Sequence, residues 1–159
     1  MKITKQNIGQ VREALVQYYK DKLNGESISN SSDVYDYFSS IFIGQVDESF
    51  YSLYLNSKNK VLFSKKISEG VPNCTIVYLR KIFEYAMGTA CSSIILAHNH
   101  PSGNVEPSEQ DCKTTRDIVT VGKLLDIRIL DHLIIGSSGK YFSFGQKGLI
   151  ELYKDSITK

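Results

Sequence analysis

Two of the three histidines in this 159-residue chain are separated by a single residue, in the stretch AHNHPSG at positions 97–103. They follow the apolar run SIIL, which predicts a buried strand. Because residues two apart point to the same side of an extended chain, His98 and His100 would converge on one point. Neutral imidazole is a good zinc ligand, and a strand is the rigid support that a preorganised site needs.

A carboxylate that would complete this pair follows at Asp111. Ser108, directly after Pro107, has the character of a helix N-cap, and Asp111 then occupies the third helical position. A helix that begins there would direct the Ser108 hydroxyl and the Asp111 carboxylate back toward the end of the strand. Two imidazoles, one carboxylate and a fourth position for water form the open arrangement of a catalytic zinc site, not the closed arrangement of a structural one.

The complete pattern from His98 to Asp111 reads H-x-H-P-x6-S-x2-D. It resembles the JAMM (MPN-type) metalloprotease motif. The segments ILAHNHPSG, PSEQD, LLDIRILDHLIIG and YFSFGQKGLI also resemble, in this order, segments of the RadC family of bacterial JAMM-domain proteins. The resemblance covers residues 48–152, and its five fixed residues make it far more specific than an isolated H-x-H.

The resemblance implies both a metal centre and a reaction class. His98, His100 and Asp111 would hold one zinc ion (Zn2+) with a bound water. Glu48 would act as the general base, and Ser108 would donate a hydrogen bond to the developing oxyanion. The implied reaction is the hydrolysis of a peptide or isopeptide bond in an unknown peptide or protein substrate.

The choice of Glu48 depends on its position before a strand. In RadC-like sequences the corresponding glutamate begins the strand that precedes an L-[DN]-x-K-N turn, and ESFYSLYLNSKN at 48–59 fits this frame. Glu69, beside Gly70 in a loop, and Glu84, within a predicted helix, are the alternatives.

Each of these residues also has a purely structural interpretation. The two histidines could lie in a loop without binding a metal, and Ser108 and Asp111 could serve only to cap a helix. Glu48 could be a solvated residue at a strand edge. The third histidine, His132, is expected to support the site rather than bind the metal, and its neighbour Asp131 could orient one of the zinc-binding histidines.

The order of the predicted elements indicates an α/β or α+β fold around one mixed β-sheet. Strands are expected at 49–55, 61–63, 74–78, 93–96, 127–130, 133–135 and 141–144, and helices at 33–42, 79–90, 108–125 and from Gly148. The segment 8–23 has helical spacing, but its ALVQYY stretch would also suit a strand. The resemblance implies an MPN/JAMM-like sheet flanked by helices, layered as in cytidine deaminases. We expect residues 1–43 to form an N-terminal extension packed on a JAMM/RadC-like domain at 44–159.

Composition limits the remaining possibilities. The net charge of +2 is too small to indicate nucleic-acid binding by itself. The first ten residues lack the apolar core of a secretory signal, and no apolar run reaches the length of a membrane span. The three cysteines have no metal-binding or disulfide spacing. A cytoplasmic protein with free thiols and no membrane association is therefore expected.

Other functions compete with the hydrolase. The letters HNH at 98–100 do not predict an HNH nuclease, whose residues are spread over a ββα unit, and a nucleobase deaminase would need H-x-E and P-C-x-x-C. A non-catalytic binding module, or a RadC-like accessory protein associated with DNA or repair proteins, remains the alternative. The chain has about forty residues before the core and no evident helix-hairpin-helix pattern there, which weakens the prediction of DNA binding.

Overall fold

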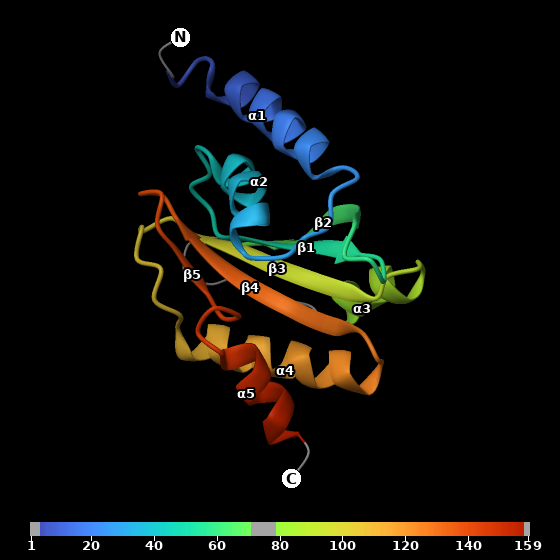
Figure 1. Ribbon diagram of the computed structural model, residues 1–159. Helices are drawn as coiled ribbons and strands as arrows, with labels where there is room; N and C mark the ends of the chain where they lie inside the picture. The colour runs from blue at the N-terminus through green and yellow to red at the C-terminus, as the bar shows by residue number, and fades with distance from the viewer. Residues whose placement is uncertain (1–3, 71–78, 158–159) are drawn as a thin grey trace.

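The computed structural model describes residues 4–70 and 79–157 (Figure 1). Within them, five strands form one sheet in the order β2-β1-β3-β4-β5, which confirms the predicted α+β class with a mixed sheet. The strands are β1 (Ser49–Leu55), β2 (Val61–Glu69), β3 (Ser93–His100), β4 (Arg128–Gly136) and β5 (Tyr141–Ser143). The helices are α1 (Ile8–Leu23), α2 (Ser32–Phe42), α3 (Leu79–Met87), α4 (Glu109–Leu124) and α5 (Leu149–Ser156). The strand predicted at 74–78 lies outside the described residues.

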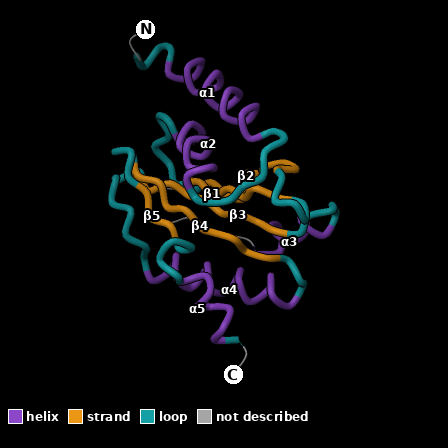
Figure 2. The backbone as a smooth tube through the Cα atoms, viewed as in Figure 1, coloured by secondary structure: helices purple, strands orange, loops and turns teal. Residues whose placement is uncertain are grey.

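Helices cover both faces of the sheet (Figures 1 and 2). Helix α2 lies on one face with α1 outside it, whereas α3, α4 and α5 lie on the opposite face. Strands β3 and β4 run parallel, and the other neighbouring pairs are antiparallel. The carboxyl ends of β3 and β4 and the amino end of β1 therefore lie at the same edge of the sheet.

Strand β3 is buried on both faces, which explains its continuous apolar run. Ile94 and Leu96 pack in the core on the α4 side, whereas Ile95 packs on the α2 side. The strand continues beyond the predicted end at residue 96 and ends at His100. The two-residue period therefore carries His98 and His100 to the face that α4 covers.

Helix α4 packs closely on that face because a glycine allows it. Thr115 and Ile118 of this helix are fully buried. A Cβ atom at Gly122 would lie 2.6 Å from the carbonyl oxygen of Ile127, so a larger residue would push the helix away. The close approach holds the carboxyl end of α4 against the residues that lead into β4, where the Ile127 N–H donates to the Gly122 carbonyl at 2.8 Å.

Two predictions for the second half of the chain are wrong. The segments at 127–130 and 133–135 form one continuous strand, β4, because the polar residues Asp131 and His132 between them are buried and continue the ladder. A register shift opposite Ile95 accommodates the extra residue. Helix α3 ends at Met87, which is 67% exposed, instead of at the predicted end at Ala90.

The segment 8–23 is helical throughout, including its ALVQYY stretch. Helix α2 buries Val34 and Phe38 against the sheet, whereas Leu23 is the one buried residue of α1. The side chain of Ser31, the N-cap residue of α2, makes no capping hydrogen bond. The Asp33 carboxylate instead accepts the backbone N–H groups of Ser29 and Asn30, at 2.7 and 3.0 Å. The division of the chain at residue 44 stays a prediction.

Two further features concern the cysteines and the helices. Cys91 and Cys112 are free thiols, and Cys74 lies outside the described residues. Along residues 4–70 and 79–157, no helix combines the length and the apolar character that crossing a membrane requires.

Candidate metal centre

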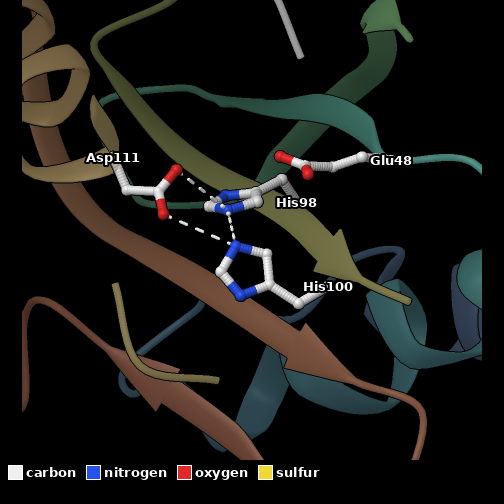
Figure 3. Close-up of side chains that lie close together, drawn as sticks. All are labelled: Glu48, His98, His100 and Asp111. Atoms are coloured by element: carbon white, nitrogen blue, oxygen red, sulfur yellow. Dashed lines mark hydrogen bonds and ion pairs between the residues drawn. The ribbon is translucent and has the colours of Figure 1, made fainter. Parts of the chain in front are cut away.

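Four side chains converge at the edge of the sheet where β1 begins and β3 ends, beside the first turn of α4 (Figure 3). They are Glu48, His98, His100 and Asp111. Each offers one possible ligand atom, and these atoms all lie within 4.8 Å of one another. Both carboxylates point toward the imidazoles (Figure 3). The structure thus brings together the three predicted metal ligands and the predicted general base.

The imidazoles both turn Nε2 toward the Asp111 carboxylate. His98 Nε2 lies 3.3 Å from Oδ1, His100 Nε2 lies 3.4 Å from Oδ2, and the two Nε2 atoms are 3.0 Å apart. His100 Nδ1 lies 2.7 Å from the carbonyl oxygen of Asn104, which can only accept, so Nδ1 carries a proton and Nε2 of the neutral ring carries a lone pair. Lone pairs that converge in this way repel one another unless a cation, a proton or a metal ion, lies between them.

The electrostatics of the cluster favour positive charge at its centre. Burial alone would lower the pKa of His100, but its hydrogen bonds with Asp111 and Asn104 raise that pKa above its ordinary value. Burial alone would raise the pKa of Asp111, but hydrogen bonds with His100 and His98 hold it well below its usual range. The carboxylate therefore stays ionised, and a divalent cation can take the place of the proton.

The start of helix α4 orients Asp111. Ser108 and Asp111 form the predicted capping box: the Asp111 N–H donates to Ser108 Oγ at 3.1 Å, and the Ser108 N–H donates to Asp111 Oδ2 at 2.7 Å. The Ser108 hydroxyl also donates to Oδ2, at 2.7 Å. This hydroxyl therefore lies beside the cluster, but it must turn away from the carboxylate before it can donate to a substrate.

Asn99, which lies between the two histidines, fixes the backbone around Glu48. Its amide oxygen accepts the N–H of Ser49 at 2.7 Å, and its amide nitrogen donates to the carbonyl of Asp47 at 3.0 Å. Glu48 itself is 6% exposed. Because both neighbours of Glu48 are held by one buried amide, the carboxylate starts from a fixed position on the edge of the sheet.

The structure separates the two alternative glutamates from this cluster. Glu69 ends strand β2, and its carboxylate pairs with Lys66 at 2.9 Å. Glu84 is exposed on helix α3. Neither belongs to the group of converging ligand atoms, which contains Glu48.

His132 lies directly behind His98, as its predicted supporting role requires. Its Nε2 is 2.8 Å from His98 Nδ1, and its Nδ1 is 2.7 Å from Thr115 Oγ1. The suggestion that Asp131 orients a zinc-binding histidine is wrong. Its carboxylate instead accepts the hydroxyl groups of Ser31 and Ser143.

Two residues that contact the cluster were not identified from the sequence. Thr115 lies one helical turn after Asp111, and this i, i+4 spacing is a signal that could have drawn attention to it. Asn104 acts through its backbone carbonyl, which any residue type would supply. The turn that delivers this carbonyl is closed by a hydrogen bond from the Gly103 N–H to the His100 carbonyl, at 2.9 Å.

A cleft of about 390 Å³ adjoins His100. Its lining includes Phe42 and Gln45 at the end of α2 and Asn99 of β3. Among the described residues that line this cleft, none is Asp, Glu, Lys or Arg, and His100 is the one histidine. The cleft therefore suits a neutral group rather than a phosphate.

A family model described as a RadC-like JAB domain matches residues 28–149. The chain belongs to this family. The match includes α2, strands β1 to β5 and all four residues of the cluster. RadC-like JAB membership thus agrees with the motif that the sequence contains between His98 and Asp111.

Curated relatives agree with this family. The chain is 41% identical over 124 residues to a UPF0758 protein of Methanosarcina mazei, a match that covers 78% of the chain and 54% of the relative. It is 38% identical over 133 residues to a UPF0758 protein of Flavobacterium johnsoniae, covering 84% of the chain and 58% of the relative. A UPF0758 protein of Staphylococcus carnosus is 39% identical over 134 residues, covering 84% and 59%. The chain therefore spans little more than half the length of these relatives.

Proposed function

We propose that this protein is a zinc-dependent hydrolase of the JAMM type that cleaves a peptide or isopeptide bond. The observation that carries the proposal is the convergence of the ligand atoms of Glu48, His98, His100 and Asp111 within 4.8 Å. Two imidazoles and one carboxylate are a donor set that suits catalytic zinc, and capping or loop closure alone would not require them to meet. Membership of the RadC-like JAB family agrees with this chemistry.

Each residue then has a defined task. His98, His100 and Asp111 would hold the zinc ion, which when bound supplies a Lewis acid and lowers the pKa of a water molecule. The Glu48 carboxylate accepts a proton from the attacking water and passes it to the leaving nitrogen. The Ser108 hydroxyl turns from Asp111 Oδ2 and donates a hydrogen bond to the developing oxyanion.

The surroundings support a polypeptide substrate. The cleft beside His100 is neutral and partly apolar, with Phe42 and Ile43 at the end of α2. An uncharged, partly apolar lining matches an uncharged side chain of a polypeptide, whereas a phosphate chain would require lysine or arginine.

A DNA-associated accessory role is the competing function. It depends on the RadC resemblance alone, and it predicts binding to duplex or branched DNA that weakens steeply as salt is raised. If the protein and a metal-free variant retain DNA equally, with that salt dependence, the accessory role is favoured over hydrolysis.

Elemental analysis of the purified protein tests the metal centre. The wild-type protein should contain about one zinc ion per chain, and the double variant His98→Ala, His100→Ala should lose it. The matched control is Asp117→Ala, which removes a carboxylate that pairs with Lys113 at the surface of α4, away from the cluster. An equal metal content in wild type and double variant would remove the proposal.

A second experiment separates metal binding from catalysis. Glu48→Gln should retain zinc and lose hydrolysis of isopeptide-linked fluorogenic peptides, because the amide cannot accept the proton. Glu69→Gln is the control, because this residue pairs with Lys66 away from the cluster. If both variants keep the wild-type rate, Glu48 is not the base.

A further inference from the structure

A chain of hydrogen bonds runs through the buried residues behind the metal centre and ends at His98. We propose that Thr115 and His132 are positioning residues that decide which nitrogen of His98 carries the proton, so that His98 presents a bare Nε2 to the ion. Because these hydrogen bonds serve the metal centre, the proposal rests on the proposed function. It assigns Thr115 and His132 a role in metal affinity.

The direction of the hydrogen bonds is set at Thr115. Its Oγ1 donates to the backbone carbonyl of Asp111 at 2.6 Å, and a carbonyl can only accept. A hydroxyl has one proton, so Thr115 Oγ1 must accept in its second contact, which is with His132 Nδ1 at 2.7 Å. His132 therefore carries a proton on Nδ1.

The same logic passes through His132 to His98. His132 is completely buried, and burial favours the neutral ring, which carries one proton. Since that proton is on Nδ1, His132 Nε2 accepts from His98 Nδ1 at 2.8 Å. His98 Nε2 is then free of that proton and faces Asp111 Oδ1 at 3.3 Å.

Aromatic packing holds both rings in place. The His132 ring stacks on Phe144, with centroids 5.0 Å apart and an angle of 11° between the planes. The His98 ring stacks on Phe50, with centroids 5.7 Å apart and an angle of 8°. The rings therefore cannot turn to exchange their nitrogens without disturbing the core, so the proton positions alone remain to be set.

Helix α4 supplies both ends of this series of hydrogen bonds. Asp111 provides a carboxylate to the cluster and, through its backbone carbonyl, the acceptor that orders Thr115. Without the Thr115 hydroxyl, His132 has no acceptor at Nδ1 and can carry its proton on Nε2. It would then donate to His98 and move the proton of His98 onto Nε2, where it competes with the ion.

The affinity test uses Thr115→Val, which keeps the shape of the side chain and removes the hydroxyl, and Thr115→Ser, which restores the hydroxyl. Zinc affinity, measured by competition with a chromogenic chelator, should fall about 10–100-fold in Thr115→Val and recover in Thr115→Ser. Thr120→Val is the matched control, because its hydroxyl makes the same bond, to the Arg116 carbonyl at 2.8 Å, away from the site. Equal zinc affinity in all four proteins would overturn the proposal.

A second readout needs neither zinc nor activity. Long-range proton–nitrogen correlation NMR distinguishes protonated from bare imidazole nitrogens. In the wild type and Thr115→Ser, His132 should carry its proton on Nδ1, with Nε2 bare, and in Thr115→Val the proton should move to Nε2. A wild-type His132 with its proton on Nε2 would refute the ordering even if every variant folds and binds zinc.

The two readouts separate this proposal from the proposed function. If zinc binds through the cluster but neither the affinity nor the proton position responds to Thr115→Val, the positioning role is wrong and the metal centre stands. If the wild-type protein binds no zinc but shows the expected proton positions and their change in Thr115→Val, the hydrolase is wrong and the hydrogen-bond order stands.

Discussion

Two carboxylates on opposite faces of the sheet have opposite surroundings. Asp131 lies on the side of helix α2 and is 6% exposed. Asp111 lies on the side of α4, and its side chain is 14% exposed. Both accept hydrogen bonds from serine hydroxyl groups and backbone N–H groups, yet only one of them belongs to a group of converging ligand atoms in the described part of the structure.

Asp131 is surrounded by donors. The hydroxyl groups of Ser31 and Ser143 donate to Oδ2, and the backbone N–H groups of His132 and Gly145 donate to Oδ1, both at 2.7 Å. Each oxygen thus accepts two hydrogen bonds, which leaves little capacity for another partner. Such a carboxylate joins helix α2 to β4 and β5 and has no further chemistry.

Asp111 has acceptors on its open side. The N–H and the hydroxyl of Ser108 both donate to Oδ2 at the start of the helix, whereas Oδ1 faces the Nε2 atom of His98 at 3.3 Å. Burial and hydrogen bonding therefore do not distinguish a structural carboxylate from a ligand. The distinction lies in whether the neighbouring groups already bring protons or still need a cation.

The largest effect should come from Asp131→Ala. Removal of this carboxylate leaves buried hydroxyl and N–H donors without an acceptor, so the free energy of unfolding should fall by about 3–5 kcal/mol. Urea denaturation measures the loss, and the folded fraction should still bind zinc like the wild type. A loss below about 1 kcal/mol would mean that water replaces the carboxylate and therefore reaches the donors around Asp131.

Asp111→Ala should have the opposite effects, with a large loss of zinc affinity and a small loss of stability. Zinc affinity, measured by chelator competition, should fall more than the roughly 100-fold typical of residues that only support a ligand. The metal-free protein should lose only about 1 kcal/mol of stability, because the lost capping interaction is a local one. Asp117→Ala is the control on the same helix, since Asp117 forms an exposed ion pair with Lys113 at 2.7 Å. Equal zinc affinity in both variants would mean that Asp111 is no more a metal ligand than Asp117.

Ser31→Ala removes one of the donors to Asp131. A hydrogen bond to a charged group contributes about 1.5–3 kcal/mol, so the unfolding free energy should decrease by that amount, and thermal unfolding should report it. Ser32→Ala is the control, because its hydroxyl bonds to Asn30 at the surface and its loss should change stability by about 0.5 kcal/mol or less. Equal losses in the two serines would argue against a closed environment at Asp131.

Ser108→Ala makes the matching change at Asp111 and should have the smallest effect on folding. Loss of the N-cap should cost about 1 kcal/mol, measured by urea denaturation, and zinc should be retained. If the hydroxyl also donates to the oxyanion, the hydrolysis rate should fall about 100–1000-fold while the zinc content stays constant. An unchanged rate would leave Ser108 with its capping role alone.

The half of the site that local spacing defines could be predicted from the sequence. His98 and His100 follow from the two-residue period of a strand, and the Ser108–Asp111 capping box follows from its three-residue spacing. Glu48 required the family resemblance, because nothing local links the start of β1 to the end of β3. The class of fold and its mixed sheet also follow from the order of local patterns.

The remainder depends on contacts that only the folded chain creates. Ser31 and Asp131 are 100 residues apart, and Thr115 and His132 are 17 apart. The polar character of Asp131 and His132 suggested a break between two strands. The structure buries both residues within β4, because Ser31 at the start of α2 and Thr115 of α4 supply their partners. A sequence pattern records that such residues are polar but not which distant groups will satisfy them.

The bond between Ser31 and Asp131 has a practical consequence for anyone who prepares shorter versions of this protein. A fragment that starts at residue 44 would lack α2, so it would leave the buried carboxylate short of a donor and uncover the apolar side chains of Leu53, Ile95 and Leu133. Such a fragment should aggregate during expression, whereas one that starts before Ile28 should remain in solution.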